Sequence, residues 1–203
     1  GSPGAVADAV LGEADDAKPT TAKDRDDVTE LPLITIDPAD ARDHDDACCA
    51  ILDDDPANPG GFLLWVAIAD VAHYVTPGSA LDAEARRRGN STYFPDRVVP
   101  MLPDRLSGDL CSLHEGVTRP CIAVEMKLSG TGEKLANRFL RGMRRSPASL
   151  SYEEAQAAID GNPSERAAPL VDSVLTPLFG AYDALKIARE RRQPLELDLP
   201  ERT

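Results

Sequence analysis

The sequence lacks an apolar segment long enough to cross a membrane. A membrane-spanning helix needs about 20 consecutive, mainly apolar residues, and even the continuous apolar run Phe62–Ala69 is far shorter. The N-terminus also lacks the basic, apolar and small-residue pattern of a secretory signal. These absences exclude a helical membrane protein and predict a soluble, cytoplasmic protein.

Cysteine is scarce, and its spacing excludes two further classes. The four cysteines form no CxxC pair, which argues against a zinc site or a redox motif. A chain of 203 residues, 42% of them hydrophobic, can build a core without disulfides. We therefore expect reduced, buried thiols in one globular domain with a tail; they are Cys48, Cys49, Cys111 and Cys121.

Basic charge is also in deficit, with 22 Lys and Arg against 35 Asp and Glu and a net charge of −13. Such a balance ordinarily argues against nucleic-acid binding, because Lys and Arg make most phosphate contacts. The excess is local, however. Residues 1–30 hold eight acids and three bases, a net −5, and residues 37–46 hold five aspartates and one arginine, a net −4. Two divalent ions would cancel the second charge.

Residues 1–30 have little apolar content, so we predict a flexible acidic linker or added tail, with the folded domain covering 31–203. Within it, strands are expected at 33–36, 47–52 and 62–69, the last covered on both faces. A hairpin should join 120–128 to 135–145. The fold class is therefore α+β, a mainly antiparallel or mixed sheet with packed helices.

Three helices are predicted from caps and apolar periodicity. One runs from Ser79 to Arg88, and a second opens with the capping box of Ser151 and Glu154. A longer third helix, kinked at Pro177, would end near Arg192 and place five residues on one face. These are Leu170, Val174, Leu178, Tyr182 and Leu185. Residues 93–113 are expected to form an ordered surface loop, and 195–199 a last strand.

The sharpest chemical signal is the acidic turn between the first two strands. Four carboxylates lie within ten residues and repel one another unless cations occupy the turn. Oxygen ligands favour Mg²⁺, with Mn²⁺ as an alternative, and such ions can activate water for phosphodiester hydrolysis. Strand alternation would point His44 away from the ion. The predicted catalytic and metal-binding residues are Asp37, Asp43, Asp45 and Asp46.

Other readings of this turn remain open. A solvated acidic turn or a structural Ca²⁺ loop would share its composition, although an EF-hand starting at Asp43 has Cys48 at its glycine position and Asp54 at its final glutamate position. A different metal-dependent phosphodiesterase, such as a DNA nuclease, is a further alternative. The aspartates alone do not recognise the sugar.

Around this turn the sequence resembles the catalytic (RNB) domain of the ribonuclease II and ribonuclease R family, and DARDHDDA is closer to the ribonuclease R branch. The resemblance continues in family order through LLWVAIADVAHYV (63–75), residues 81–113 and CIAVEMKLS (121–129). It covers about residues 31–200. The chain is thereby identified as the N-terminal part of such a domain.

The resemblance implies a processive 3′→5′ exoribonuclease that hydrolyses single-stranded RNA to nucleoside 5′-monophosphates with Mg²⁺. By motif position, Asp37 and Asp46 would be the firmest metal ligands, and Asp45 the residue whose loss most impairs chemistry. Tyr93 matches the tyrosine that packs on a nucleotide near the RNA 3′ end. No obligate protein partner or membrane contact is implied.

The sequence also departs from the family pattern. The later paired arginines and the flanking cold-shock and S1 modules are absent from these 203 residues, and Leu197 stands where the family often has an aromatic residue. We therefore expect weak or no activity from these residues alone. The rival hypothesis is a non-catalytic module, either RNA-binding or Ca²⁺-stabilised.

Two further features are weighed as structural or functional. Asp70 could accept a hydrogen bond near the metal site or cap the turn after the central strand. The arginines at 138, 141, 144 and 145 could meet phosphates, but charged strand faces are usually solvated. Alternation would place Arg141 and Arg145 on one face and the other two on the opposite face.

Overall fold

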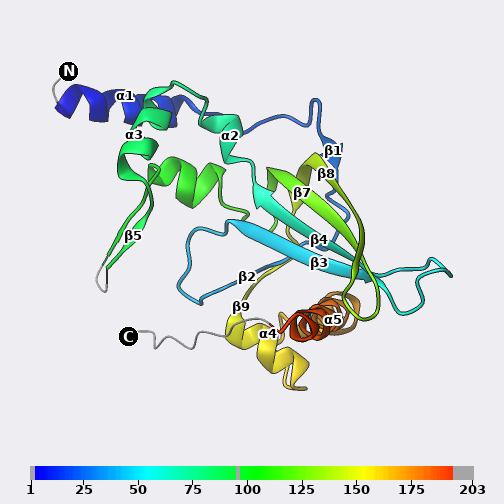
Figure 1. The fold of residues 1–203 in the computed structure, drawn as a ribbon. Coiled ribbons are helices and arrows are strands. Elements are labelled where there is room, and N and C mark those ends of the chain that lie inside the picture. The colour runs from blue at the N-terminus through cyan, green and yellow to red at the C-terminus, as the bar shows by residue number, and fades with distance from the viewer. Residues whose placement is uncertain (1–2, 95–96, 194–203) are drawn as a thin grey trace.

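The computed structural model describes residues 3–94 and 97–193. The strand predicted at 195–199 and the position of Leu197 lie outside these residues. The fold class is confirmed as α+β: a five-stranded mixed sheet in the order β1-β8-β7-β4-β3 is packed by helices (Figure 1). Its strands are β1 (Asp26–Asp27), β3 (Asp46–Leu52), β4 (Phe62–Ala69), β7 (Thr118–Leu128) and β8 (Lys134–Arg145).

Strand β4 lies inside the sheet, antiparallel to β3 on one side and to β7 on the other. Alternate residues along it enter two separate cores. Trp65 and Ala67 point to the core beneath α1, α3 and η1, whereas Leu64 and Phe62 point to the core beneath α4 and α5. The prediction of a strand covered on both faces is confirmed, and it explains the uninterrupted apolar run.

Helices gather at the two ends of the molecule, as Figure 1 shows. The caps predicted for α3 and α4 are both confirmed: Ser79 and Ser151 each accept a hydrogen bond from a backbone N–H three residues on, and Glu154 completes the capping box. The helices are α1 (Pro3–Asp16), α2 (Val71–Tyr74), α3 (Ala80–Arg88), α4 (Tyr152–Ile159) and α5 (Thr176–Arg191).

The third predicted helix is confirmed in extent, but one of its residues and the predicted surface loop differ from the prediction. The helix is uninterrupted from Ala168 to Arg191 and changes its winding along the way: η2 (Ala168–Leu170) and η3 (Val171–Leu175) lead directly into α5, whose second residue is Pro177. Tyr182 is 56% exposed, so it does not share the buried face of Leu178. The expected surface loop contains a small hairpin, β5 (Thr92–Tyr93) with β6 (Val98–Val99), and the π-helical turn η1 (Arg105–Leu110).

The N-terminal segment also differs from the predicted flexible linker. Val10 and Ala14, one helical turn apart, are buried in the core, and both oxygens of Glu13 accept hydrogen bonds from the first N–H groups of α3, at Ala80 and Leu81. Strand β1 then pairs with β8. Only two residues of α1 that the structure shows to be buried, Val10 and Ala14, mark its apolar face, and they are one turn apart. So short a pattern does not predict a helix from the sequence.

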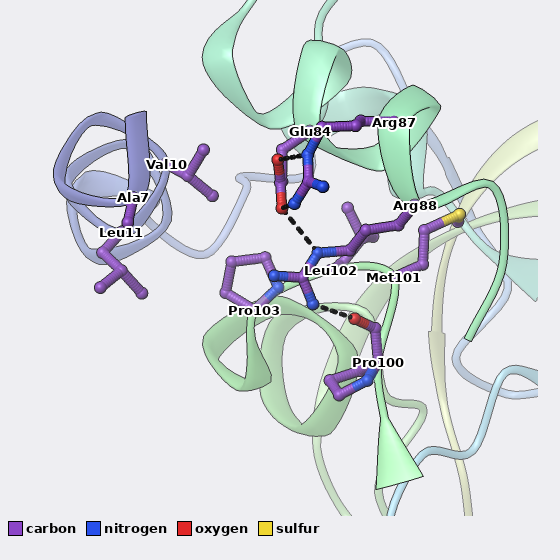
Figure 2. A pocket seen from close by; sticks show the side chains of 10 residues that line it. All are labelled: Ala7, Val10, Leu11, Glu84, Arg87, Arg88, Pro100, Met101, Leu102 and Pro103. Atoms are coloured by element: carbon purple, nitrogen blue, oxygen red, sulfur yellow. Dashed lines mark hydrogen bonds and ion pairs between the residues drawn. The ribbon is translucent and has the colours of Figure 1, made fainter. Parts of the chain in front are cut away.

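A cavity lies between α1 and α3, away from the acidic turn. Its volume is about 590 Å³, and Figure 2 shows Glu84 bonded to Arg87 and Arg88 along its wall. None of the four aspartates lines it.

Within the described residues no helix is long and apolar enough to cross a membrane. All four cysteines are free thiols, and three of them are buried.

Candidate active site

Two adjacent strand ends deliver the first and last aspartates of the turn. Asp37 ends β2 (Thr35–Asp37), which pairs in parallel with β9 (Ser149–Ser151), so that Asp37 lies opposite Ser151. Asp46 begins β3. An antiparallel bridge between Ile34 and Cys48 makes β2 and β3 neighbours and brings the end of one beside the start of the other.

The carboxylates of the turn lie close enough to affect each other's ionisation. Partial burial raises the pKa of Asp45, and the like charges of Asp43, Asp46 and Asp37 raise it further. Burial raises the pKa of Asp46 too, with Asp37 as its charged neighbour. The structure therefore brings all four predicted aspartates into one electrostatically coupled group.

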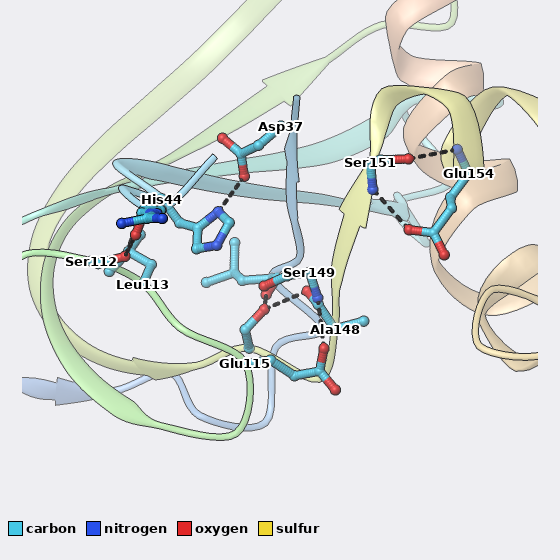
Figure 3. Close-up of polar contacts among 12 residues, drawn as sticks. Asp37, His44, Ser112, Leu113, Glu115, Ala148, Ser149, Ser151 and Glu154 are labelled. Atoms are coloured by element: carbon cyan, nitrogen blue, oxygen red, sulfur yellow. Dashed lines mark hydrogen bonds and ion pairs between the residues drawn. The ribbon is translucent and has the colours of Figure 1, made fainter. Parts of the chain in front are cut away.

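His44 lies within this group, contrary to the expectation from strand alternation. Its Nδ1 is 2.7 Å from Oδ2 of Asp37, and both side chains are largely buried (Figure 3). The prediction failed because residues 43–45 are not in a strand: β3 starts only at Asp46, so the alternation rule does not apply to them. His44 thus orients one of the four carboxylates.

Tyr93 of β5 faces the same turn although it is about fifty positions further along the chain. Its ring is 68% exposed, and the charge of Asp43 is the main cause of its raised pKa, followed by burial and by Asp45. The small hairpin that carries it was not predicted. An exposed aromatic ring beside a carboxylate cluster is available for stacking.

The donor chemistry of the turn suits a hard divalent cation, since it offers carboxylate oxygens whose mutual repulsion a cation would relieve. The side chains as they stand do not form a coordination sphere. In residues 3–94 and 97–193, no three His, Cys, Asp or Glu side chains are grouped so that they could hold a metal ion. The metal-ligand set therefore stays a prediction.

Sequence reasoning missed a serine that contacts the backbone of the turn. Ser112 is completely buried, and its Oγ accepts a hydrogen bond from the N–H of His44 at 3.0 Å. The next residue, Leu113, donates its own N–H to the carbonyl of His44 at 2.8 Å. Ser112 and His44 are 68 positions apart, so no local pattern could have revealed the contact.

Asp70 neither caps a helix nor contacts the acidic turn. It occupies the N-cap position of α2 without a side-chain capping bond. Instead it pairs with Arg25 at 2.6 Å and with Arg141 at 3.2 Å. Burial raises the pKa of Asp70, but the hydrogen bonds from the two guanidinium groups outweigh this and hold it below its ordinary value. Both functions considered for Asp70 are replaced by a structural ion pair.

The arginines of β8 are distributed over two faces as predicted, but they are not all solvated. Arg138 bonds to Glu125 and lies over the ring of Trp65. Arg144 is fully buried and donates to the carbonyls of Leu113 and Leu33. Burial lowers its pKa to about 10, so it stays charged at neutral pH.

Comparison with known proteins gives one family and consistent relatives. The family model described as the RNB domain matches residues 25–203. Ribonuclease R of Vibrio parahaemolyticus is 46% identical over 179 residues, which is 87% of this chain and 21% of that protein. Ribonuclease R of Vibrio cholerae is 41% identical over 201 residues, 98% of this chain and 24% of that protein.

A solved structure shows the same fold. The chain superposes on Mycoplasma genitalium RNase R, in complex with ribose-methylated single-stranded RNA, with a TM-score of 0.81 and 31% identity. The match covers 92% of this chain and 28% of that one. This chain therefore spans about a fifth to a quarter of the length of the curated relatives described above.

Proposed function

Since the chain belongs to the RNB-domain family of ribonuclease R, we propose that it supplies the carboxylate half of the active site of a hydrolytic 3′→5′ exoribonuclease. The substrate would be single-stranded RNA and the products nucleoside 5′-monophosphates. The observation that carries the proposal is the electrostatic coupling of Asp37, Asp43, Asp45 and Asp46 at two adjacent strand ends.

The chain's own residues have distinct parts in this proposal. Asp37 and Asp46 are fixed by β2 and β3 and would be the most rigid ligands. Asp43 and Asp45 lie in the turn between them and can move toward an ion. His44 restrains one oxygen of Asp37 and leaves the other free. Tyr93 offers an exposed ring on which a base near the RNA 3′ end could stack.

The proposed cofactor is Mg²⁺, with Mn²⁺ as a substitute. When bound by these carboxylates it would polarise the scissile phosphate and lower the pKa of a water molecule. In the free chain burial, and after it the like charges, raise the pKa of Asp45, which disfavours its ionised form. A cation would reverse that effect and draw the turn together.

Activity is proposed for a complete enzyme of which these residues form part, because the chain covers 21% and 24% of its Vibrio relatives. For the 203 residues alone we expect weak or no hydrolysis. Carboxylate ligands need supporting groups around the substrate phosphates. We expect the enzyme to act in the cytoplasm without an obligate protein partner.

The experiment has a binding part and a turnover part. Calorimetric titration of the purified chain with Mg²⁺, Mn²⁺ and Ca²⁺ should show tighter binding of the first two. The Asp45→Asn variant should bind these two ions more weakly. For turnover, the matching segment of the Vibrio parahaemolyticus enzyme is replaced by residues 25–203. The chimera should release 5′-mononucleotides from single-stranded RNA, and Asp45→Asn in it should abolish release while RNA still binds.

Two outcomes would contradict the proposal. A chimera that folds and binds RNA but releases no mononucleotides would show that these aspartates do not serve the reaction. A chain that binds only Ca²⁺, and gains stability from it, would instead support the structural-loop alternative. Parallel assays on single-stranded DNA test the alternative of a DNA nuclease.

A further inference from the structure

The backbone of the acidic turn is held on both sides of Asp43 by one side chain. Ser112 Oγ accepts from the N–H of His44 at 3.0 Å and donates to the carbonyl of Arg42 at 3.3 Å. A third bond, from the N–H of Leu113 to the carbonyl of His44, closes the contact. In Figure 3 Ser112 and Leu113 lie directly against His44, whose ring reaches toward Asp37.

The segment that carries Ser112 is itself fixed to the sheet. Arg144, fully buried on β8, donates from one nitrogen to the carbonyl of Leu113 at 3.0 Å and from another to the carbonyl of Leu33 at 2.9 Å. Leu33 lies just before β2, the strand that ends in Asp37. A single guanidinium therefore joins the support of the turn to the approach of β2.

The hydrogen bonds of Ser112 oppose the electrostatic repulsion between the carboxylates of the turn. Four carboxylates with too little countercharge push the turn open, and a turn of irregular backbone has no strand ladder to resist them. The two hydrogen bonds of Ser112 fix the backbone of residues 42 and 44 relative to β8 and so hold the backbone of Asp43 between them, while its side chain can still turn toward an ion. Because Ser112 is completely buried, water does not compete for these bonds.

We infer that Ser112 is a positioning residue, which holds the turn so that Asp43 and Asp45 can share a divalent cation with Asp37 and Asp46. The effect on metal binding rests on the proposed function. The contact between Ser112 and the backbone of the turn does not, because the structure shows it directly. In this role Ser112 would act through the backbone of Arg42 and His44, to which its hydroxyl bonds, and not as a ligand of the ion.

The test compares Ser112→Ala with a matched control, Ser146→Ala. Ser146 is also buried, and its Oγ donates to the carbonyls of Leu33 and Ala148, neither of which belongs to the turn. Both variants thus remove one buried hydroxyl with two hydrogen bonds. Two quantities are measured on the purified chain: the Mn²⁺ dissociation constant by electron paramagnetic resonance, and amide hydrogen exchange of His44 by NMR.

For Ser112→Ala we expect the Mn²⁺ dissociation constant to rise about tenfold, which is the lower end of the effect of losing a group that supports metal ligands. Exchange of the His44 amide should accelerate at least as much, because that N–H loses its acceptor. For Ser146→Ala the dissociation constant should stay within about twofold of the wild-type value, even where thermal stability falls equally.

Unchanged Mn²⁺ affinity in Ser112→Ala, or an equal loss in both variants, would overturn the positioning role. If the wild-type chain binds no Mn²⁺, the metal part of the proposed function fails by itself. The contact is then decided by exchange alone, and an unchanged rate at the His44 amide overturns it. The two failures are therefore distinguishable.

Discussion

Tyr93 of the small β5–β6 hairpin lies within electrostatic range of Asp43 in the acidic turn, and the charge of this carboxylate is the main cause of the raised pKa of the phenol. The tyrosine side chain is 68% exposed. A carboxylate cluster that would hold a metal therefore has an accessible aromatic ring at its edge, which suits a base next to a scissile phosphate.

We predict that Tyr93→Ala weakens binding of single-stranded RNA by about 1–3 kcal/mol, the usual value of one stacked base, whereas Tyr93→Phe retains most of the affinity. Fluorescence anisotropy in the Asp45→Asn chimera measures this without turnover. Phe94→Ala is the control, because Phe94 is the next residue and is exposed too. Equal losses in both alanine variants would remove the specific role of Tyr93.

A second prediction concerns the charge of the turn. Asp45→Asn removes one of four like charges, so the metal-free chain should gain on the order of 0.5 kcal/mol in free energy of unfolding at pH 7. Because the pKa of Asp45 is raised in the folded chain, stability falls as pH rises from the ordinary aspartate pKa through the raised one. The variant should lose that part of the pH dependence.

Thermal unfolding with and without Mg²⁺ tests the same charge repulsion, because a bound cation would neutralise it. The wild-type chain should gain more in Tm from Mg²⁺ than Asp45→Asn does. Asp54→Asn, an exposed aspartate in the β3–β4 connection, serves as the control and should respond like the wild type. A metal-free Asp45→Asn chain less stable than wild type would contradict the prediction.

The buried pair of Arg25 and Asp70 leads to a third prediction. Asp70→Asn leaves the Arg25 guanidinium buried without its countercharge, which should cost about 3–5 kcal/mol. Because the pKa of Asp70 is held below its ordinary value, the pair stabilises the chain above the unfolded-state pKa, and this stabilisation is lost as pH falls through the folded-state value.

Urea unfolding at pH 7 and at successively lower pH tests this pair. The difference between wild type and Asp70→Asn should be largest near neutrality and shrink in acid. Asp82→Asn is the control, since its partner Arg86 is 75% exposed and solvent screens such a pair, so that its loss should change stability little. A difference that persists unchanged at low pH would show that the charge of Asp70 is not the cause.

What could be predicted from the sequence was local. The apolar run of β4, the hairpin of β7 and β8 and the capping box at Ser151 depend on residues within a few positions of each other, and each was confirmed. The acidic turn was found for the same reason. Its four aspartates are close in space mainly because they are close in the chain.

What could not be predicted depends on contacts between distant segments. Arg25 and Asp70, which form an ion pair, are 45 positions apart in the sequence. From the sequence, Asp70 was considered only as a hydrogen-bond acceptor near the metal site or as a cap of the turn after the central strand. The orientation of His44 was predicted wrongly because the alternation rule for strands was applied to residues 43–45, which precede β3. Burial of Arg144 follows only from the approach of Leu33 and Leu113, which no pattern along β8 records.

Arg144 gives the last prediction, and it separates stability from metal binding. Arg144→Ala removes the donors of two buried carbonyls and leaves a cavity, so the free energy of unfolding should fall by about 3 kcal/mol or more. Arg144→Lys should lose less, because its single ammonium retains the charge and can still reach one of the two carbonyls. Arg145→Ala, at the exposed neighbouring position, should stay within about 0.5 kcal/mol.

Urea unfolding of the three variants measures these differences, and an Arg144→Ala chain within 1 kcal/mol of wild type would contradict the structural role. The comparison with Ser112→Ala then becomes informative. Both side chains belong to the same support of the acidic turn, but only Ser112 bonds to the turn itself. Loss of Arg144 should therefore act mainly on folding, and loss of Ser112 mainly on the affinity of the folded chain for its cation.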